Sequence, residues 1–205
     1  MNLLFDQLFA GNKESEIFLS FPEKNDPLKY QEFLNETKCM ASRLKTLGLE
    51  KGDRLALQIE KSHHVFTIYG ACVQLGIIFI PLNTNYTAVE VEYFIKDSEC
   101  KSFITTTKML KDLVSQEKKV SSKIETIDAD YTGSFFSNFD ENDPLEIIEK
   151  QNEDDIAAIL YTSGTTGRSK GAMLSQKNLL SNALTLSESW GFTASDVLLL
   201  SLIHI

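Results

Sequence analysis

Strand-like and helix-like segments alternate along residues 54–127, and this alternation constrains the fold more than any other feature of the sequence. The short apolar stretches 54–59, 76–82 and 102–105 are typical of buried strands, and residues 63–75 carry apolar side chains over most of a helical circumference. A strand that returns to its sheet through a helix lies parallel to its neighbour, with a right-handed crossover. The sequence therefore predicts an α/β fold, in which βαβ units build a mainly parallel sheet flanked by helices.

Further elements are expected on both sides of this stretch. The first residues have the spacing of an amphipathic helix, and Thr87 with Glu90 forms a capping-box sequence that opens another helix. Ser62 and Ser175 are expected to cap helices that follow them. We also expect helices over 30–47, 87–97 and 107–117, a helix after 175, and strands over 16–20, 123–127, 156–161, 172–174 and 196–202.

Residues 128–155 interrupt the alternation. They contain Gly133, Pro144 and a run of acidic side chains. Such a charge run is usually a solvated face. We therefore expect a surface excursion with one short helix at 145–150 and no binding role.

The overall composition excludes several classes of protein. Hydrophobic and charged contents of 42% and 24% are those of an ordinary globular protein, and no apolar run approaches the ~20 residues of a membrane-spanning helix. A formal charge of −9 disfavours nucleic acid and anionic membranes as partners. The first nine residues lack the basic start of a secretory signal. We expect a cytoplasmic protein without membrane insertion, and the oligomeric state stays open.

The cysteines and the paired histidines suggest structural roles. Cys39, Cys72 and Cys100 are widely spaced and show no metal-binding or redox spacing, so we interpret them as reduced core or boundary residues. His63 and His64 are neighbours at the start of a helix, where adjacent side chains point about 100° apart. Because the sequence offers no third ligand nearby, it favours capping or solvent-facing roles over a metal site.

Residues 161–171, Tyr-Thr-Ser-Gly-Thr-Thr-Gly-Arg-Ser-Lys-Gly, have the character of a phosphate-binding loop. Glycines at 164, 167 and 171 allow positive φ angles and a close approach of the backbone, so that amide N–H groups can converge on an anion. The hydroxyls add donors, and Lys170 adds a mobile positive charge. The nucleotide-hydrolase loop has a different spacing, because its second glycine would fall at Ser169.

This segment resembles the YTSGTTG-x-x-KG signature of the adenylate-forming superfamily, which includes acyl-CoA synthetases, peptide-synthetase adenylation domains and beetle luciferases. Residues 52–56 are similar to the family's G-D-R-V-A strand entry, and residues 79–83 to its stretch ending in P-L-N/D. Residues 82–87 and 167–175 look most like malonyl-CoA synthetases, the branch that activates a short dicarboxylate.

The carboxyl-terminal residues 200–204 resemble the L-P-x-[FY]-H segment that lines the acyl pocket in this family. Ser201 and Ile203 replace the usual proline and aromatic residue. The resemblance implies that His204 lies beside the substrate carboxylate and the adenylate.

The resemblance implies a reaction in which a carboxylic acid attacks the α-phosphate of Mg-ATP, pyrophosphate leaves, and the thiol of coenzyme A captures the acyl-adenylate. Lys170 and Thr166 are implied as catalytic residues, and Thr162 is implied as a ligand of Mg²⁺. The residues implied to hold ATP are Thr162, Ser163, Gly164, Thr165, Thr166, Gly167 and Lys170.

The resemblance covers essentially the whole chain but only the first part of the family's length. We therefore expect residues 1–205 to be a partial N-terminal AMP-binding domain, without the rest of that domain and the small lid domain, and inactive on its own. Two other functions stay open. One is an adenylation domain that passes acyl-AMP to a carrier protein, and the other is a non-catalytic module that binds phosphate or nucleotide.

Overall fold

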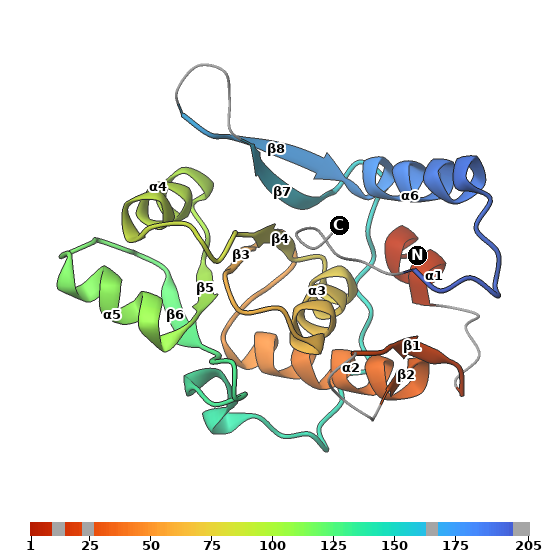
Figure 1. Cartoon of the computed structure of the whole chain (residues 1–205), viewed down its shortest axis with the longest axis horizontal. Coiled ribbons are helices and arrows are strands. Elements are labelled where there is room, and N and C mark those ends of the chain that lie inside the picture. Colours follow the sequence, from red (N-terminus) through yellow and green to blue (C-terminus); the bar gives the residue numbers. More distant parts are fainter. Residues whose placement is uncertain (10–14, 22–26, 163–167, 199–205) are drawn as a thin grey trace.

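The computed structural model describes residues 1–9, 15–21, 27–162 and 168–198 (Figure 1). The elements, in chain order, are α1 (Leu3–Phe9), β1 (Ile17–Leu19), β2 (Leu28–Lys29), α2 (Tyr30–Thr46), β3 (Arg54–Leu57), α3 (His63–Leu75), β4 (Ile78–Pro81), α4 (Ala88–Ser98), β5 (Ser102–Thr105), α5 (Thr107–Ser115), β6 (Lys123–Thr126), the 3₁₀ helix η1 (Ser134–Asn138), β7 (Ile156–Thr162), β8 (Lys170–Ser175) and α6 (Gln176–Trp190).

A six-stranded sheet with the strand order β6-β5-β3-β4-β7-β8 forms the centre of the molecule. Its first five strands run parallel, as the strand–helix alternation predicted. β1 and β2 form a separate antiparallel pair. β8 differs, because it runs antiparallel to β7. Residues 163–169 between β7 and β8 are fewer than the roughly dozen that a parallel crossover needs, so this connection is a hairpin.

Helices cover both faces of the sheet, and alternate side chains of β3 enter different cores. Leu55 and Leu57 pack in a cluster with buried residues of α2 and α3, whereas Ala56 belongs to a cluster with α4 and α5. This division follows from the two-residue period of a strand. A third cluster joins α1 to Phe33, Val73 and Ala157, and half-buried leucines of α6 pack against it.

The helix boundaries largely follow the capping signals of the sequence. Gly76 follows the last residue of α3 and caps it with a φ of 66°. In the predicted capping box of α4, the Thr87 N–H donates to the Glu90 carboxylate at 2.8 Å, and the Glu90 N–H donates to the Thr87 hydroxyl at 3.4 Å. The bond from the Thr87 N–H, together with one that the Thr87 hydroxyl donates to the same carboxylate at 2.8 Å, lowers the pKa of Glu90. Ser62 takes the N-cap position of α3, but its side chain accepts no capping hydrogen bond from the described residues of that helix.

The prediction of a helix at 145–150 is wrong. These residues run along the protein without regular structure, and the only helical turn described within 128–155 is η1. The backbone groups of this part bond to distant elements: Leu145 N–H donates to the Lys38 carbonyl at 3.1 Å, and Glu149 N–H donates to the Gln74 carbonyl at 2.9 Å. Long-range partners thus satisfy groups that a helix would have paired locally.

The prediction of a strand over 196–202 is wrong for the part that the structure describes. Residues 196–198 form no strand, and Val197 is 94% exposed. They belong to neither of the described sheets, and residues 199–202 lie outside the described part. The helix predicted after Ser175 is confirmed, and the Ser175 hydroxyl accepts a hydrogen bond from the Asn178 N–H at 3.2 Å.

The three cysteines are buried and form no disulfide, which agrees with their interpretation as reduced residues. Burial raises the pKa of Cys72 and of Cys100.

No described helix combines the length and the apolar character that a membrane crossing requires.

Gly133 provides a test of the turn that leads into η1. It takes a φ of 134°, and a Cβ there would lie 2.1 Å from the Thr126 carbonyl oxygen. We expect Gly133→Ala to lower the free energy of unfolding by about 3 kcal/mol or more, because a backbone clash adds to a conformation that is essentially restricted to glycine. Urea denaturation measures this change.

Gly48→Ala is the matched control. Gly48 has a φ of 86°, but a Cβ added there would meet no atom within 4 Å, so only the conformational cost of about 1–2 kcal/mol is expected. Equal losses in the two variants would show that the contact with Thr126 does not restrict position 133.

Candidate active site

The β7–β8 hairpin carries the two ends of the segment predicted to bind phosphate. Its register pairs Thr162 with Lys170 and Tyr161 with Gly171. Ser163, Gly164, Thr165, Thr166 and Gly167 lie outside the described residues, and so does His204. The structure therefore describes Thr162 and Lys170 among the predicted site residues and places them opposite each other.

The position of β7 in the sheet determines where the hairpin emerges. β7 lies parallel to β4, with Phe79 in register with Ala158, so Thr162 ends β7 at the edge formed by the carboxyl ends of the parallel strands (Figure 1). In open α/β sheets, ligands bind beside this edge. The hairpin thus presents its loop at the edge where a binding site is expected.

Gly171 has a different role from the one predicted. Its φ is not among the positive angles of the described glycines. A Cβ at this position would lie 2.8 Å from Ile159 Cγ2 and 3.3 Å from the Tyr161 ring. Glycine is needed here because side chains of β7 cover the backbone of β8.

Two tyrosines attach the base of the hairpin to α4. The Tyr161 hydroxyl donates to the Asp97 carboxylate at 2.6 Å, and the Tyr93 hydroxyl donates to the Ser169 carbonyl at 2.9 Å. The Tyr161 ring also lies 4.5 Å from the Phe94 ring. Burial, reinforced by the bond to Asp97, raises the pKa of Tyr161, so this hydroxyl keeps its proton as a donor.

Sequence reasoning missed these contacts of α4. Tyr93 and Asp97 are four residues apart in the sequence, which places them on one face of the helix. That spacing was a usable signal. It did not reveal that this face would meet the hairpin, because the pairing joins segments far apart in the chain.

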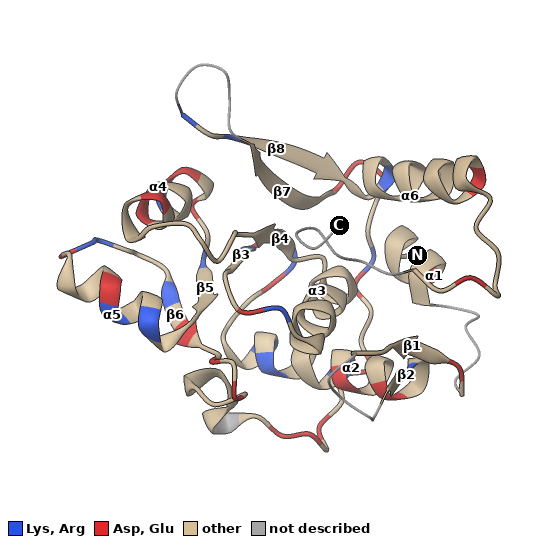
Figure 2. Cartoon of the chain, in the orientation of Figure 1, with Lys and Arg blue, Asp and Glu red and all other residues tan. Residues whose placement is uncertain are grey.

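Positive charge gathers at the start of β8. Arg168 and Lys170 are both exposed, and Figure 2 shows basic residues beside the part of the hairpin that is not described. The Arg168 guanidinium lies 6.0 Å from the centre of the Tyr93 ring. Thr162 is also exposed. A ligand at the carboxyl edge can therefore meet a hydroxyl and two cations in a protein whose net charge is −9.

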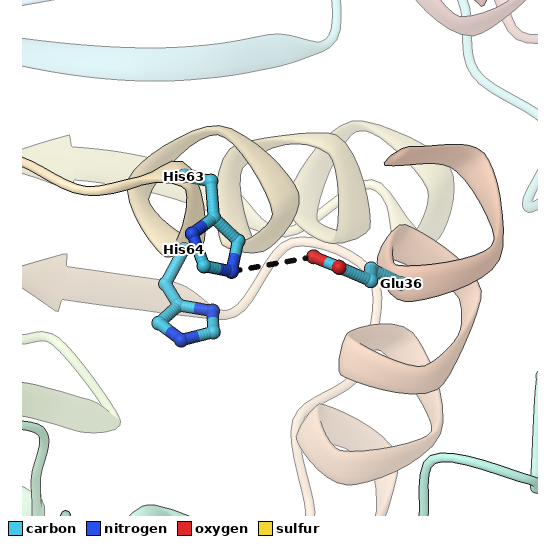
Figure 3. A group of neighbouring side chains, drawn as sticks. All are labelled: Glu36, His63 and His64. Atoms are coloured by element: carbon cyan, nitrogen blue, oxygen red, sulfur yellow. Dashed lines mark ion pairs between the residues drawn. The ribbon is translucent and has the colours of Figure 1, made fainter. Parts of the chain in front are cut away.

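A second group of polar side chains corrects the analysis of the paired histidines. Glu36 from α2 lies beside His63 and His64, and one ligand atom from each of the three lies within 4.8 Å of the others (Figure 3). The prediction that no third ligand is near was wrong. The third ligand comes from a different helix, which spacing within one helix cannot reveal.

Comparisons with known proteins agree with the fold and with the family that the sequence resembles. The family of AMP-binding enzymes matches residues 7–205. The chain is 31% identical to 2-succinylbenzoate–CoA ligase of Bacillus licheniformis, over 87% of this chain and 36% of the ligase. It is 30% identical to tyrocidine synthase 2 of Brevibacillus parabrevis, over 94% of this chain and 5% of the synthase.

Solved structures also resemble this chain over nearly its whole length. Apo MatB from Rhodopseudomonas palustris is 38% identical, with a TM-score of 0.84 over 95% of this chain and 39% of MatB. The ATP-bound form of MatB matches with the same values. The chain thus spans well under half the length of each of these relatives. Its fold is that of the N-terminal domain of adenylate-forming enzymes, and the chain belongs to the AMP-binding enzyme family.

Proposed function

We propose that this chain contributes the phosphate-binding part of an ATP-dependent acyl-CoA synthetase. In this reaction a carboxylic acid displaces pyrophosphate from ATP to give acyl-AMP, and coenzyme A then takes the acyl group and releases AMP. The observation that carries the proposal is the β7–β8 hairpin, whose register sets Thr162 opposite Lys170 at the carboxyl edge of the sheet. Residues 1–205 would form the first part of the large N-terminal domain.

The chain's own residues fit the first half of this reaction. When the carboxylate attacks the α-phosphate, negative charge develops on the departing pyrophosphate, and fixed positive groups stabilise that charge. Lys170 is exposed at the start of β8 and can supply a mobile ammonium group. We propose that Thr166 and the other loop hydroxyls and amides add neutral donors around the same phosphates.

Thr162 is the proposed contact for Mg²⁺. Its hydroxyl is a hard oxygen ligand of the kind that Mg²⁺ takes, and the residue is exposed at the end of β7. Bound Mg²⁺ would neutralise charge on the phosphates. His204 is proposed to lie beside the acid being activated.

Malonate, or a similarly short acid, is the proposed substrate. The support is the resemblance of residues 82–87 and 167–175 to malonyl-CoA synthetases. The identity to MatB is 38%, against 21% to a Mycobacterium tuberculosis fatty acyl CoA synthetase. The similarity to tyrocidine synthase 2 favours one alternative, in which the acyl-adenylate passes to a carrier protein instead of coenzyme A.

The first experiment is pyrophosphate release from ATP, measured with malonate, methylmalonate and acetate on the full-length product of the gene. We expect release that depends on malonate, and Lys170→Ala should reduce it by about 100-fold or more, the usual cost of removing one group that stabilises the transition state. Adding coenzyme A or an acyl-carrier protein then identifies the acceptor.

Lys177→Ala is the control for charge. Lys177 is also an exposed lysine close to the hairpin, but its ammonium pairs with Glu153 at 3.2 Å, so its loss should leave release nearly unchanged. Release without dependence on any of the three acids would contradict the proposed synthetase function. Equal losses in the two lysine variants would contradict the proposed role of Lys170.

A second experiment tests how α4 positions the loop. Tyr93→Phe removes the hydroxyl that donates to the Ser169 carbonyl and keeps the ring. We expect pyrophosphate to bind about 2- to 10-fold more weakly, because one hydrogen bond of about 0.5–1.5 kcal/mol no longer restrains Ser169. Isothermal titration calorimetry on the 205-residue chain measures this affinity.

Tyr86→Phe is the matched control, because the Tyr86 ring packs on Phe94 at 4.8 Å but belongs to the loop before α4. The Tyr86→Phe variant should bind pyrophosphate with the affinity of the unaltered chain. Equal weakening in both variants would indicate a general loss of stability rather than positioning of the hairpin by Tyr93.

A further inference from the structure

The group formed by Glu36, His63 and His64 lies away from the hairpin, where α2 packs against the start of α3 (Figure 3). Glu36 Oε2 is 3.6 Å from His63 Nε2. Four tetrahedral ligands at about 2.1 Å from a zinc ion lie about 3.4 Å from one another. The Glu36–His63 pair is therefore already close to ligand spacing. The ligand atom of His64 lies within 4.8 Å of those of Glu36 and His63, and small side-chain rotations would shorten these two distances to ligand spacing.

Aromatic contacts restrict the orientation of the histidine rings. The His64 ring lies 3.9 Å from the His63 ring, 4.8 Å from the Tyr131 ring at 90°, and 5.1 Å from the Phe136 ring. Tyr131 takes a φ of 64°, a conformation that residues other than glycine rarely adopt. Ligands held by their neighbours lose little freedom when an ion binds.

The surroundings favour a cation. A cavity of about 650 Å³ opens beside the group, and the described residues that line it include Glu32, Glu36 and Glu141 but no lysine or arginine. Glu36 Oε2 is buried and accepts no hydrogen bond from any described group. A bound cation would offset this excess of negative charge.

We propose that Glu36, His63 and His64 bind a divalent transition-metal ion, with Zn²⁺ as the expected ion and the cavity providing its fourth coordination position. Two imidazoles and one carboxylate form a zinc ligand set that leaves a position for water or another small ligand. The ion would join α2 to α3 beneath Tyr131. This site is separate from the Mg²⁺ contact proposed at Thr162, which lies at the end of β7.

Titration of the full chain with Co²⁺, followed by competition with Zn²⁺, tests this site, because Co²⁺ with such ligands has visible absorption bands. We expect saturation at one equivalent, displacement by Zn²⁺, and a higher thermal unfolding midpoint with Zn²⁺ present. Glu36→Gln and His63→Ala should each weaken Co²⁺ binding at least about tenfold, since even the loss of an outer partner of a ligand costs 10- to 100-fold.

Glu32→Gln is the matched control. Glu32 lies on the same helix and lines the same cavity, so this change removes an identical charge without removing a ligand, and binding should change less than about threefold. Glu36→Gln also relieves repulsion among acidic groups, so the metal-free variant should fold, which circular dichroism checks.

Two results would overturn the proposal. One is the absence of a saturable Co²⁺ band in the folded chain. The other is binding that persists in Glu36→Gln and His63→Ala but is lost in Cys39→Ser, because Cys39 lines the same cavity and would then be the metal ligand instead.

Discussion

Burial of both faces of the central sheet is the constraint on which the rest of the structure depends. Leu55 and Leu57 of β3 pack in one core and Ala56 packs in the other. Each fully buried leucine stabilises the folded state by about 1.5–3 kcal/mol. Parallel strands return to their sheet through crossover connections, usually helices, and these helices cover both faces of the sheet. All their carboxyl ends then lie at one edge of the sheet. β7 joins this sheet beside β4, so the position of the signature loop follows from how the core is buried.

The hairpin, which carries the proposed site, departs from this regular pattern because β8 runs antiparallel to β7. An antiparallel strand needs only a short connection, so residues 163–169 are enough to join β7 to β8. The same arrangement requires Gly171, since side chains of β7 lie over the backbone of β8. Tyr93 and Tyr161 then bond the base of the hairpin to α4. The sheet positions the loop, and α4 restrains its two ends.

The sequence predicted what local patterns determine. Apolar periodicity and Gly76 predicted the bounds of α3, and the pair of Thr87 and Glu90 predicted the start of α4. Local patterns failed where partners are distant in the chain. The acidic run in 128–155 suggested a solvated excursion, yet its backbone bonds to α2 and α3. The tyrosine contacts of the hairpin and the position of Glu36 beside the histidines were missed for the same reason. The residues that bind in the tip of the loop and His204 remain sequence-based proposals.

The segment after β6 connects the proposed metal site to the core. Phe135 of η1 is fully buried, and its carbonyl accepts a hydrogen bond from Arg43 Nε at 2.7 Å. Arg43 also pairs with Glu125 at 3.8 Å, and both side chains are about nine-tenths buried. A buried charge left without its partner is costly, so these bonds hold η1 and the turn before it against α2. Tyr131 lies in that turn and covers the two histidines. The segment that interrupts the strand–helix alternation therefore packs against the proposed ligands of α2 and α3 and lines the cavity that they face.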